Sequence, residues 1–142
     1  EIEDGVRSIR AGNKAYEKGY NQYLDGKNFF DASLEASGMT VEGLYENRVL
    51  LENTIDKMGS MGMDTSRLEE NLASLNMAIG TYEQLETSRE QLEAAKKELE
   101  DGGRELHKGR EELNEAKEEG LKELSDAKKE LDVICGAVSA LF

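Results

Sequence analysis

The sequence predicts an all-α fold: a long antiparallel coiled-coil helical hairpin, with a shorter tip hairpin beyond a break near Gly38. Three observations predict it. Large apolar residues recur at every seventh position in two separate arms, a small residue follows each of them by three, and the chain of 142 residues contains no proline. Spacings of three and four residues place both sets on one face of a helix, which is the pattern of a heptad repeat.

The first arm, residues 1–37, is predicted to be one helix in which glycine is the small residue. Its large set is Ile2, Ile9, Tyr16, Tyr23 and Phe30, and its small set is Gly5, Gly12, Gly19, Gly26 and Ser33. Each glycine inside a helix costs about 1 kcal/mol relative to alanine. Close approach of a second helix, which seats a large side chain over each glycine, would offset that cost. Loops are the alternative, but loops do not keep a seven-residue phase over four repeats.

The segment after the first arm carries signals for two helix ends and two helix starts. Gly38 suits the position just past a helix, and Thr40 suits the N-cap of a second helix. The glycine-rich stretch 59–64 is the predicted turn of the tip hairpin. Ser66 and Glu69 have the spacing of a capping box, which predicts the start of the last helix.

The second arm, residues 83–142, repeats the pattern with leucine as the large residue. Its large set is Leu85, Leu92, Leu99, Leu106 and Leu113, and its small set is Ser88, Ala95, Gly102, Gly109 and Ala116. We expect every large residue of one arm to face a small residue of the other. This rule predicts that Gly19 lies opposite Leu106 and that Gly26 lies opposite Leu99. The predicted chain therefore comprises an ascending stalk helix, a tip helical hairpin over 38–82, and a descending stalk helix.

The C-terminal end of the second arm is predicted to be an overhang. In the predicted register, residues from about 124 onward have no partner within the chain. We expect them to pair with sequence upstream of Glu1 in a longer parent protein, since a chain that begins without methionine reads as an excised part. Alone, the overhang is expected to form a homodimer, with Leu131, Ile134 and Val138 as the contact.

The charge balance limits the classes of partner. The chain carries 31 acidic and 18 basic residues, a formal net charge of −13. Nucleic acid is not an expected partner, because its binding relies on neutralising phosphates with lysine and arginine. An anionic membrane surface would also repel the chain.

No pattern in the sequence predicts chemistry. There is no nucleophile–base set and no glycine-rich phosphate loop, so we expect no enzyme and no catalytic, cofactor or metal site. The single histidine, His107, is predicted to lie on the surface, because zinc sites need several His or Cys ligands. The single cysteine, Cys135, is interpreted as a small buried apolar residue, with a redox or intermolecular role as the alternative.

One candidate binding feature lies at the predicted turn. Met58, Met61 and Met63 are clustered there. Methionine side chains adapt to partner surfaces, so these three residues are the candidate contact with a protein partner. Plain packing of the turn is one alternative, and a Cu(I) site is another, because thioethers favour that ion.

The repeat resembles a known family. The segments QLEAAKKELEDGGRELHKGREELNEAKEEG and DGVRSIRAGNKAYEKGYNQYLDGKNFFDAS resemble the long extracellular coiled-coil insertions of FtsX-like (MacB-type) ABC transporter permeases. YhgE/Pip-type membrane proteins carry similar glycine-punctuated repeats. The resemblance implies a non-catalytic stalk on the extracellular face of a bacterial cell membrane, joined to the rest of a parent membrane protein. Such a stalk would relay motion or engage a partner or substrate. The competing interpretation is a soluble structural coiled-coil spacer or oligomerisation module in the cytoplasm.

Overall fold

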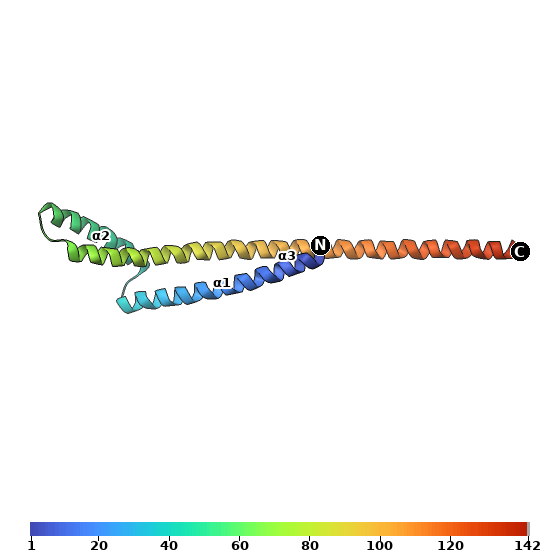
Figure 1. The fold of residues 1–142 in the computed structure, drawn as a ribbon, viewed down its shortest axis with the longest axis horizontal. Helices are drawn as coiled ribbons and strands as arrows, with labels where there is room; N and C mark the ends of the chain where they lie inside the picture. Colours follow the sequence, from blue (N-terminus) through green and yellow to red (C-terminus); the bar gives the residue numbers. More distant parts are fainter. Residues whose placement is uncertain (142) are drawn as a thin grey trace. The chain divides into compact units, whose positions relative to one another are not determined.

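The computed structural model describes residues 1–141 and has three α-helices joined by two short connections (Figure 1). The helices are α1 (Ile2–Ser37), α2 (Val41–Ser60) and α3 (Ser66–Leu141). No strand occurs within these described residues. The predicted all-α helical hairpin is therefore confirmed, while supercoiling of its helices stays a prediction.

The chain divides into two compact units. The central unit is residues 13–97, and the terminal unit is residues 1–12 together with the chain from residue 98 onward. The central unit holds the end of α1, all of α2 and the start of α3. Within it, α2 lies beside the first turns of α3 (Figure 1).

The first connection confirms the predicted break. Gly38 has φ +65°, a left-handed conformation that glycine adopts without steric cost. Its N–H donates to the carbonyl oxygen of Glu35 (3.1 Å), and the N–H of Met39 donates to the carbonyl oxygen of Leu34 (3.0 Å). These two bonds form a Schellman motif, which satisfies carbonyl groups that the end of α1 would otherwise leave without partners.

The start of α2 is also as predicted. Thr40 is the N-cap, with an extended backbone, and its Oγ1 accepts a hydrogen bond of 3.0 Å from the N–H of Gly43. This bond satisfies one of the free donors in the first turn of the helix. The acidic Glu42 in that turn complements the positive end of the helix dipole.

The second connection differs from the prediction in its capping. α2 continues to Ser60, and Gly62 then takes φ +71°. The predicted capping box of Ser66 and Glu69 is wrong, because the Ser66 hydroxyl donates to Asp64 Oδ1 (2.6 Å). The N–H of Glu69 donates to the carbonyl oxygen of Thr65 (2.9 Å). Ser66 is already helical, so Thr65 occupies the cap position, and Asp64 supplies the accepting side chain for the Ser66 N–H (3.0 Å).

Glycines of α1 do lie against leucines of α3, in a different register from the predicted one. In the central unit, a Cβ atom built on Gly19 would lie 3.3 Å from Leu92 Cδ2, and one built on Gly26 would lie 3.3 Å from Leu85 Cδ2. The predicted partners were Leu106 and Leu99, so the predicted register is wrong by two heptads. The terminal unit keeps the observed register: its corresponding contacts are Gly5 with Leu106 (3.1 Å) and Gly12 with Leu99 (2.6 Å).

The end of α1 explains why this register is preferred. A shift by any whole number of heptads keeps large residues opposite small ones, so the repeat alone does not distinguish the registers. The observed register brings Phe30 against Tyr82, with ring centroids 6.0 Å apart. There Phe30 is buried to 7% exposure. Burying a phenylalanine side chain stabilises by about 1.5–3 kcal/mol relative to leaving it exposed.

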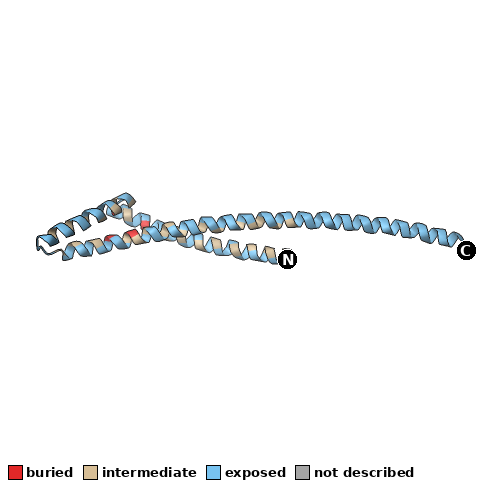
Figure 2. Ribbon diagram, turned by 90° about the horizontal axis from the view of Figure 1, so that it is seen from above, coloured by how far each residue is buried: buried red, intermediate tan, exposed pale blue. Residues whose placement is uncertain are grey.

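The buried residues gather where the three helices meet in the central unit (Figure 2). They are Phe30 of α1, Leu44 of α2, and Leu75 and Ile79 of α3. No other described residue is buried to this degree. The core therefore joins the last turns of α1 to both helices of the tip hairpin.

The overhang begins earlier than predicted. Every described residue from Arg110 through Leu141 is exposed, and Figure 2 shows this stretch of α3 in pale blue. The predicted start near residue 124 is wrong for the same reason as the register, because a shift of two heptads leaves fourteen more residues of α3 without a partner. No helix within residues 1–141 has an apolar stretch long enough to cross a bilayer.

Candidate functional site

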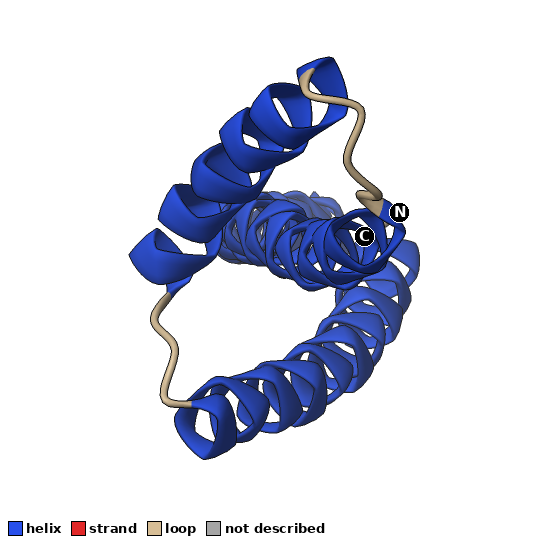
Figure 3. Cartoon of the chain, turned by 90° about the vertical axis from the view of Figure 1, so that its left-hand side faces the viewer, coloured by secondary structure: helices blue, strands red, loops and turns tan. Residues whose placement is uncertain are grey.

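The central unit contains an open groove of about 710 Å³ between its three helices. Viewed end on, α1 and α2 lie on different sides of α3 (Figure 3). The groove is lined by 15 residues drawn from the three helices and from the connection at Met39. None of them is charged, although charged residues make up 35% of the chain.

The floor and the rim of the groove come from neighbouring positions in the same helices. Phe30, Leu44 and Leu75 are buried and form the floor. Phe29, the residue before Phe30, is 76% exposed, and Leu50 on α2 is 67% exposed. Successive residues in a helix point about 100° apart, so the same turn that buries Phe30 leaves Phe29 at the edge. The groove is thus anchored by the core and bordered by exposed apolar side chains.

The polar side chains of the lining are largely satisfied within their own helices. The hydroxyl of Ser33 donates to the carbonyl oxygen of Phe29 (2.9 Å), and that of Ser74 to Glu70 (3.2 Å). The Thr81 hydroxyl donates to the Met77 carbonyl oxygen (3.0 Å). The donors of these hydroxyls are therefore already engaged, and the side-chain amides of Asn47 and Asn71 are the other polar groups of this uncharged lining, together with Ser37.

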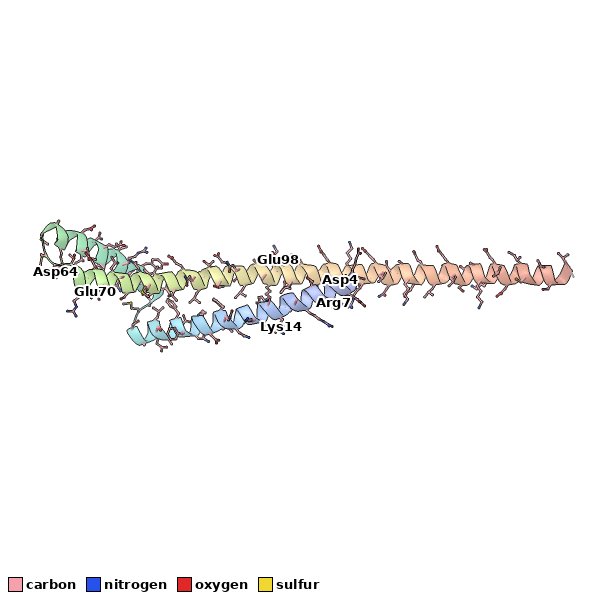
Figure 4. The ribbon with its side chains drawn as sticks, in the orientation of Figure 1. Asp4, Arg7, Lys14, Asp64, Glu70 and Glu98 are labelled. Atoms are coloured by element: carbon pink, nitrogen blue, oxygen red, sulfur yellow. The ribbon has the colours of Figure 1, made fainter. Side chains whose placement is uncertain are left out.

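The surroundings of the groove are acidic. Five carboxylates and a single guanidinium are next to lining residues in the sequence: Asp31, Glu35, Glu46, Arg48, Glu52 and Glu70. All but Arg48 are exposed, and Figure 4 labels Glu70 on the first turns of α3. The Arg48 guanidinium carbon lies 5.2 Å from the centre of the Tyr45 ring. Glu46, Arg48 and Glu70 lie three or four residues from lining residues and so share the groove-lining faces of α2 and α3, where two carboxylates outnumber one guanidinium.

Tyr45, which follows Leu44 of the groove lining, has a shifted pKa. Desolvation raises the pKa of its phenol, and the hydrogen bond that its hydroxyl donates to Glu83 Oε1 (3.2 Å) raises it further. The phenol stays protonated at neutral pH, so it acts as a donor that ties α2 to α3. It is suited to structure and not to proton transfer near pH 7.

The predicted contact residues lie apart from this groove. Met61 and Met63, in the second connection, are 60% and 53% exposed, while Met58 in the last turn of α2 is half-buried. The Met58 carbonyl oxygen accepts hydrogen bonds from the N–H groups of both Met61 (3.1 Å) and Met63 (3.0 Å). The side chains of Met61 and Met63 are thus exposed to solvent at this turn. Their role in binding a partner stays a prediction.

The histidine and the cysteine both lie on the surface of α3. His107 is exposed, with Nε2 3.2 Å from Glu111 Oε1, as expected for a surface residue. Cys135 is exposed, so its interpretation as a buried apolar residue is wrong. It belongs to the overhang, where α3 has no packing partner. Within residues 1–141 there is no group of three or more His, Cys, Asp or Glu side chains arranged to hold a metal ion.

Sequence reasoning missed the groove because of the predicted register. That register ended α1 two heptads too far along α3, so that α1 did not lie beside α2. A signal for the groove was present. Phe29 and Leu50 are large apolar residues that lie outside the heptad stripes, one on each of the two helices that flank the groove. Apolar residues off the packing stripe indicate a second apolar face.

Comparison with protein-family models, with curated proteins and with solved structures finds no match for this chain. The resemblance to the insertions of FtsX-like permeases therefore rests on the repeat itself. Two features of the described residues bear on function. They are the glycine–leucine contacts of α1 with α3 and the uncharged groove between the three helices.

Proposed function

We propose that this chain is a non-catalytic stalk domain of a bacterial membrane transporter or permease, placed on the extracellular face, which relays motion or engages a protein partner or substrate. The observation that carries the proposal is the repeated contact of α1 glycines with α3 leucines at every seventh residue. Such contacts hold two helices together with no ligand, metal or enclosed polar site. A helix pair built in this way is suited to mechanical support.

The charged residues favour a supporting role over chemistry. Their ion pairs are exposed and join residues three or four apart on one helix, as in Arg89 with Glu86 (2.8 Å) and Glu93 (3.1 Å). The hydrogen bond and charge of Glu86 raise the pKa of Arg89, with a further contribution from Glu93. Pairs of this kind solvate and modestly stabilise helix faces.

The overhang supports a proposal about partners. Leu131, Ile134 and Val138 are 59%, 58% and 47% exposed along one stripe of α3. We propose that this stripe pairs with the rest of the parent membrane protein or, in the isolated chain, with a second copy. The charges beside the stripe are mixed, with Asp126 paired to Lys129 (3.1 Å), so pairing of two copies works against the repulsion between two chains that each carry a net charge of −13.

The location can be tested through the exposed Cys135. Cells expressing the full-length parent protein are treated with a membrane-impermeant maleimide before and after lysis, and a Cys135→Ser variant shows which signal belongs to this residue. We expect labelling of intact cells. Labelling only after lysis would contradict the extracellular location and favour a cytoplasmic spacer. A Glu98→Cys variant in the Cys135→Ser background repeats the test at a second exposed site, in case a partner covers Cys135 (Figure 4).

A further inference from the structure

We propose that the groove of the central unit binds one amphipathic helix of a protein partner, with an apolar face turned into the groove and lysine or arginine on its flanks. The helix would occupy the position of a fourth helix beside α1, α2 and α3. The inference rests on the proposed partner-binding role and deepens it by naming the class of partner. It does not depend on a membrane or on an extracellular location.

The arrangement of the three helices favours a helix as the occupant. α1 and α2 both pack on α3 through the shared core of Phe30, Leu44 and Leu75, and they leave between them an open groove of about 710 Å³. Figure 3 shows the two helices on different sides of α3. An amphipathic helix fits such a groove by inserting side chains spaced at i, i+3, i+4 and i+7.

The lining defines the face that the occupant turns inward. It contains no charged residue, and the hydroxyls of Ser33, Ser74 and Thr81 already donate to carbonyl oxygens of their own helices. A charged group placed here would lose its hydration without gaining a partner, at a high cost in free energy. Phe29 and Leu50, both largely exposed, are available to be covered by apolar side chains.

The rim defines the flanks. Within residues 1–141, the carboxylates of Glu46 and Glu70 form no ion pair. Glu46 lies four residues before Leu50 and Glu70 four residues before Ser74, so these two carboxylates share the groove-lining faces of α2 and α3. Lysine or arginine on the flanks of an entering helix would meet these charges, which speeds association and selects the partner.

A second copy of the chain is a poorer occupant. Two copies joined by a two-fold axis would bring the same acidic rims together, since each copy would present the same surface. The net charge of −13 adds to this repulsion. An occupant with basic flanks removes the repulsion, so charge complementarity favours a different protein.

The experiment uses the purified chain and two synthetic helical peptides of about five turns each. Both peptides carry leucine at the i, i+3, i+4 and i+7 positions and one tryptophan, and they differ only in having lysine or glutamate on the flanks. Because the chain contains no tryptophan, the fluorescence of the peptide reports binding directly. We expect the lysine peptide to bind about tenfold or more tightly than the glutamate peptide, with an affinity that falls as salt is added.

Two variants on α2 form the matched pair. Leu50→Asp changes a lining residue that is 67% exposed, and Val49→Asp changes its neighbour, which is 53% exposed and lies outside the groove. Because both side chains are largely in solvent, the helix content and the melting temperature should be retained in each. We expect Leu50→Asp to weaken binding of the lysine peptide by about tenfold or more, and Val49→Asp to leave it nearly unchanged.

Three results would overturn the inference: no binding of the lysine peptide, equal binding of the two peptides, or equal effects of the two variants. A dimer of the chain that Leu50→Asp alone dissociates would assign the groove to a second copy instead. None of these outcomes bears on labelling of Cys135 in cells. Failure of the groove proposal and failure of the extracellular stalk proposal are therefore distinguishable.

Discussion

Gly12 of α1 and Leu99 of α3 approach so closely that a Cβ atom on Gly12 would lie 2.6 Å from Leu99 Cδ2. Real Cβ atoms essentially never come that near to another atom, so any larger residue at position 12 must displace the leucine. The glycine here is needed for packing and not for its backbone conformation. Its cost in helix propensity is offset by the contact that it permits.

The first prediction concerns this contact. Gly12→Leu should lower the melting temperature, because overpacking costs about 1–3 kcal/mol and pushes the two helices apart. The matched control is Gly103→Leu, which lies inside α3 with no atom within 4 Å of a built Cβ. That change should keep or raise the melting temperature, since leucine favours a helix over glycine by up to about 1 kcal/mol. Equal melting temperatures in a thermal scan would contradict the pairing.

The second prediction distinguishes the observed register from the predicted one. In a Cys135→Ser background, Gly12→Cys with Leu99→Cys should form a disulfide on mild oxidation, because these residues are in contact. Gly12→Cys with Leu113→Cys, which would pair after a shift of two heptads, should not, since Leu113 is 57% exposed. Non-reducing gel mobility measures both. Efficient cross-linking of the second pair would contradict the observed register and support the one predicted from the sequence.

The third prediction is a pH dependence at the second connection. Hydrogen bonds from the Ser66 hydroxyl and N–H lower the pKa of Asp64 below its ordinary value of 3.8. A lowered pKa means that ionised Asp64 stabilises the fold above pH 3.8, and that this stabilisation is lost as the pH falls through the lower, folded value. The melting-temperature gap between the unchanged chain and Asp64→Ala should therefore be widest near neutral pH and narrow in acid.

The control for this pH dependence is Ser66→Ala, which removes the hydroxyl that donates to Asp64 Oδ1 (2.6 Å). In that background, the gap caused by Asp64→Ala should change less over the same range. If the Asp64→Ala gap stays constant from neutral to acidic pH, the cap at the start of α3 does not depend on the ionised carboxylate.

The fourth prediction concerns pairing of two copies through the overhang. Because each copy carries a net charge of −13, self-association should strengthen as salt screens the repulsion between copies, with the Debye length falling from about 30 Å at 0.01 M to about 3 Å at 1 M. Sedimentation at these two ionic strengths measures the effect. Leu131→Asp should abolish the dimer, whereas Leu121→Asp, which is 58% exposed but off the stripe, should keep it. A dimer that Leu131→Asp leaves intact would rule out this surface.

The sequence predicted the helices and their ends well because those signals are local. Gly38 and Thr40 each act through bonds to residues at most four positions away, so their roles follow from the residues themselves. The register of the arms is a different kind of problem. Every heptad offers Gly19 an equivalent leucine, and only the burial of Phe30 against α2 and α3 separates the choices. The groove forms only in the observed register. It could not be predicted from the sequence, because the heptad repeat does not determine which register is adopted.

The repeated glycine–leucine contacts have a consequence for how such a chain can change during evolution. Inserting seven residues into both α1 and α3 adds one heptad to each helix, with its large and its small residue. Every existing glycine–leucine contact then keeps its partner. Each insertion lengthens the helix pair by about 10 Å, at 1.5 Å per residue, without disturbing the groove or its core. Related proteins could therefore set the reach of the binding region in steps of one heptad, while insertions of other lengths would be selected against.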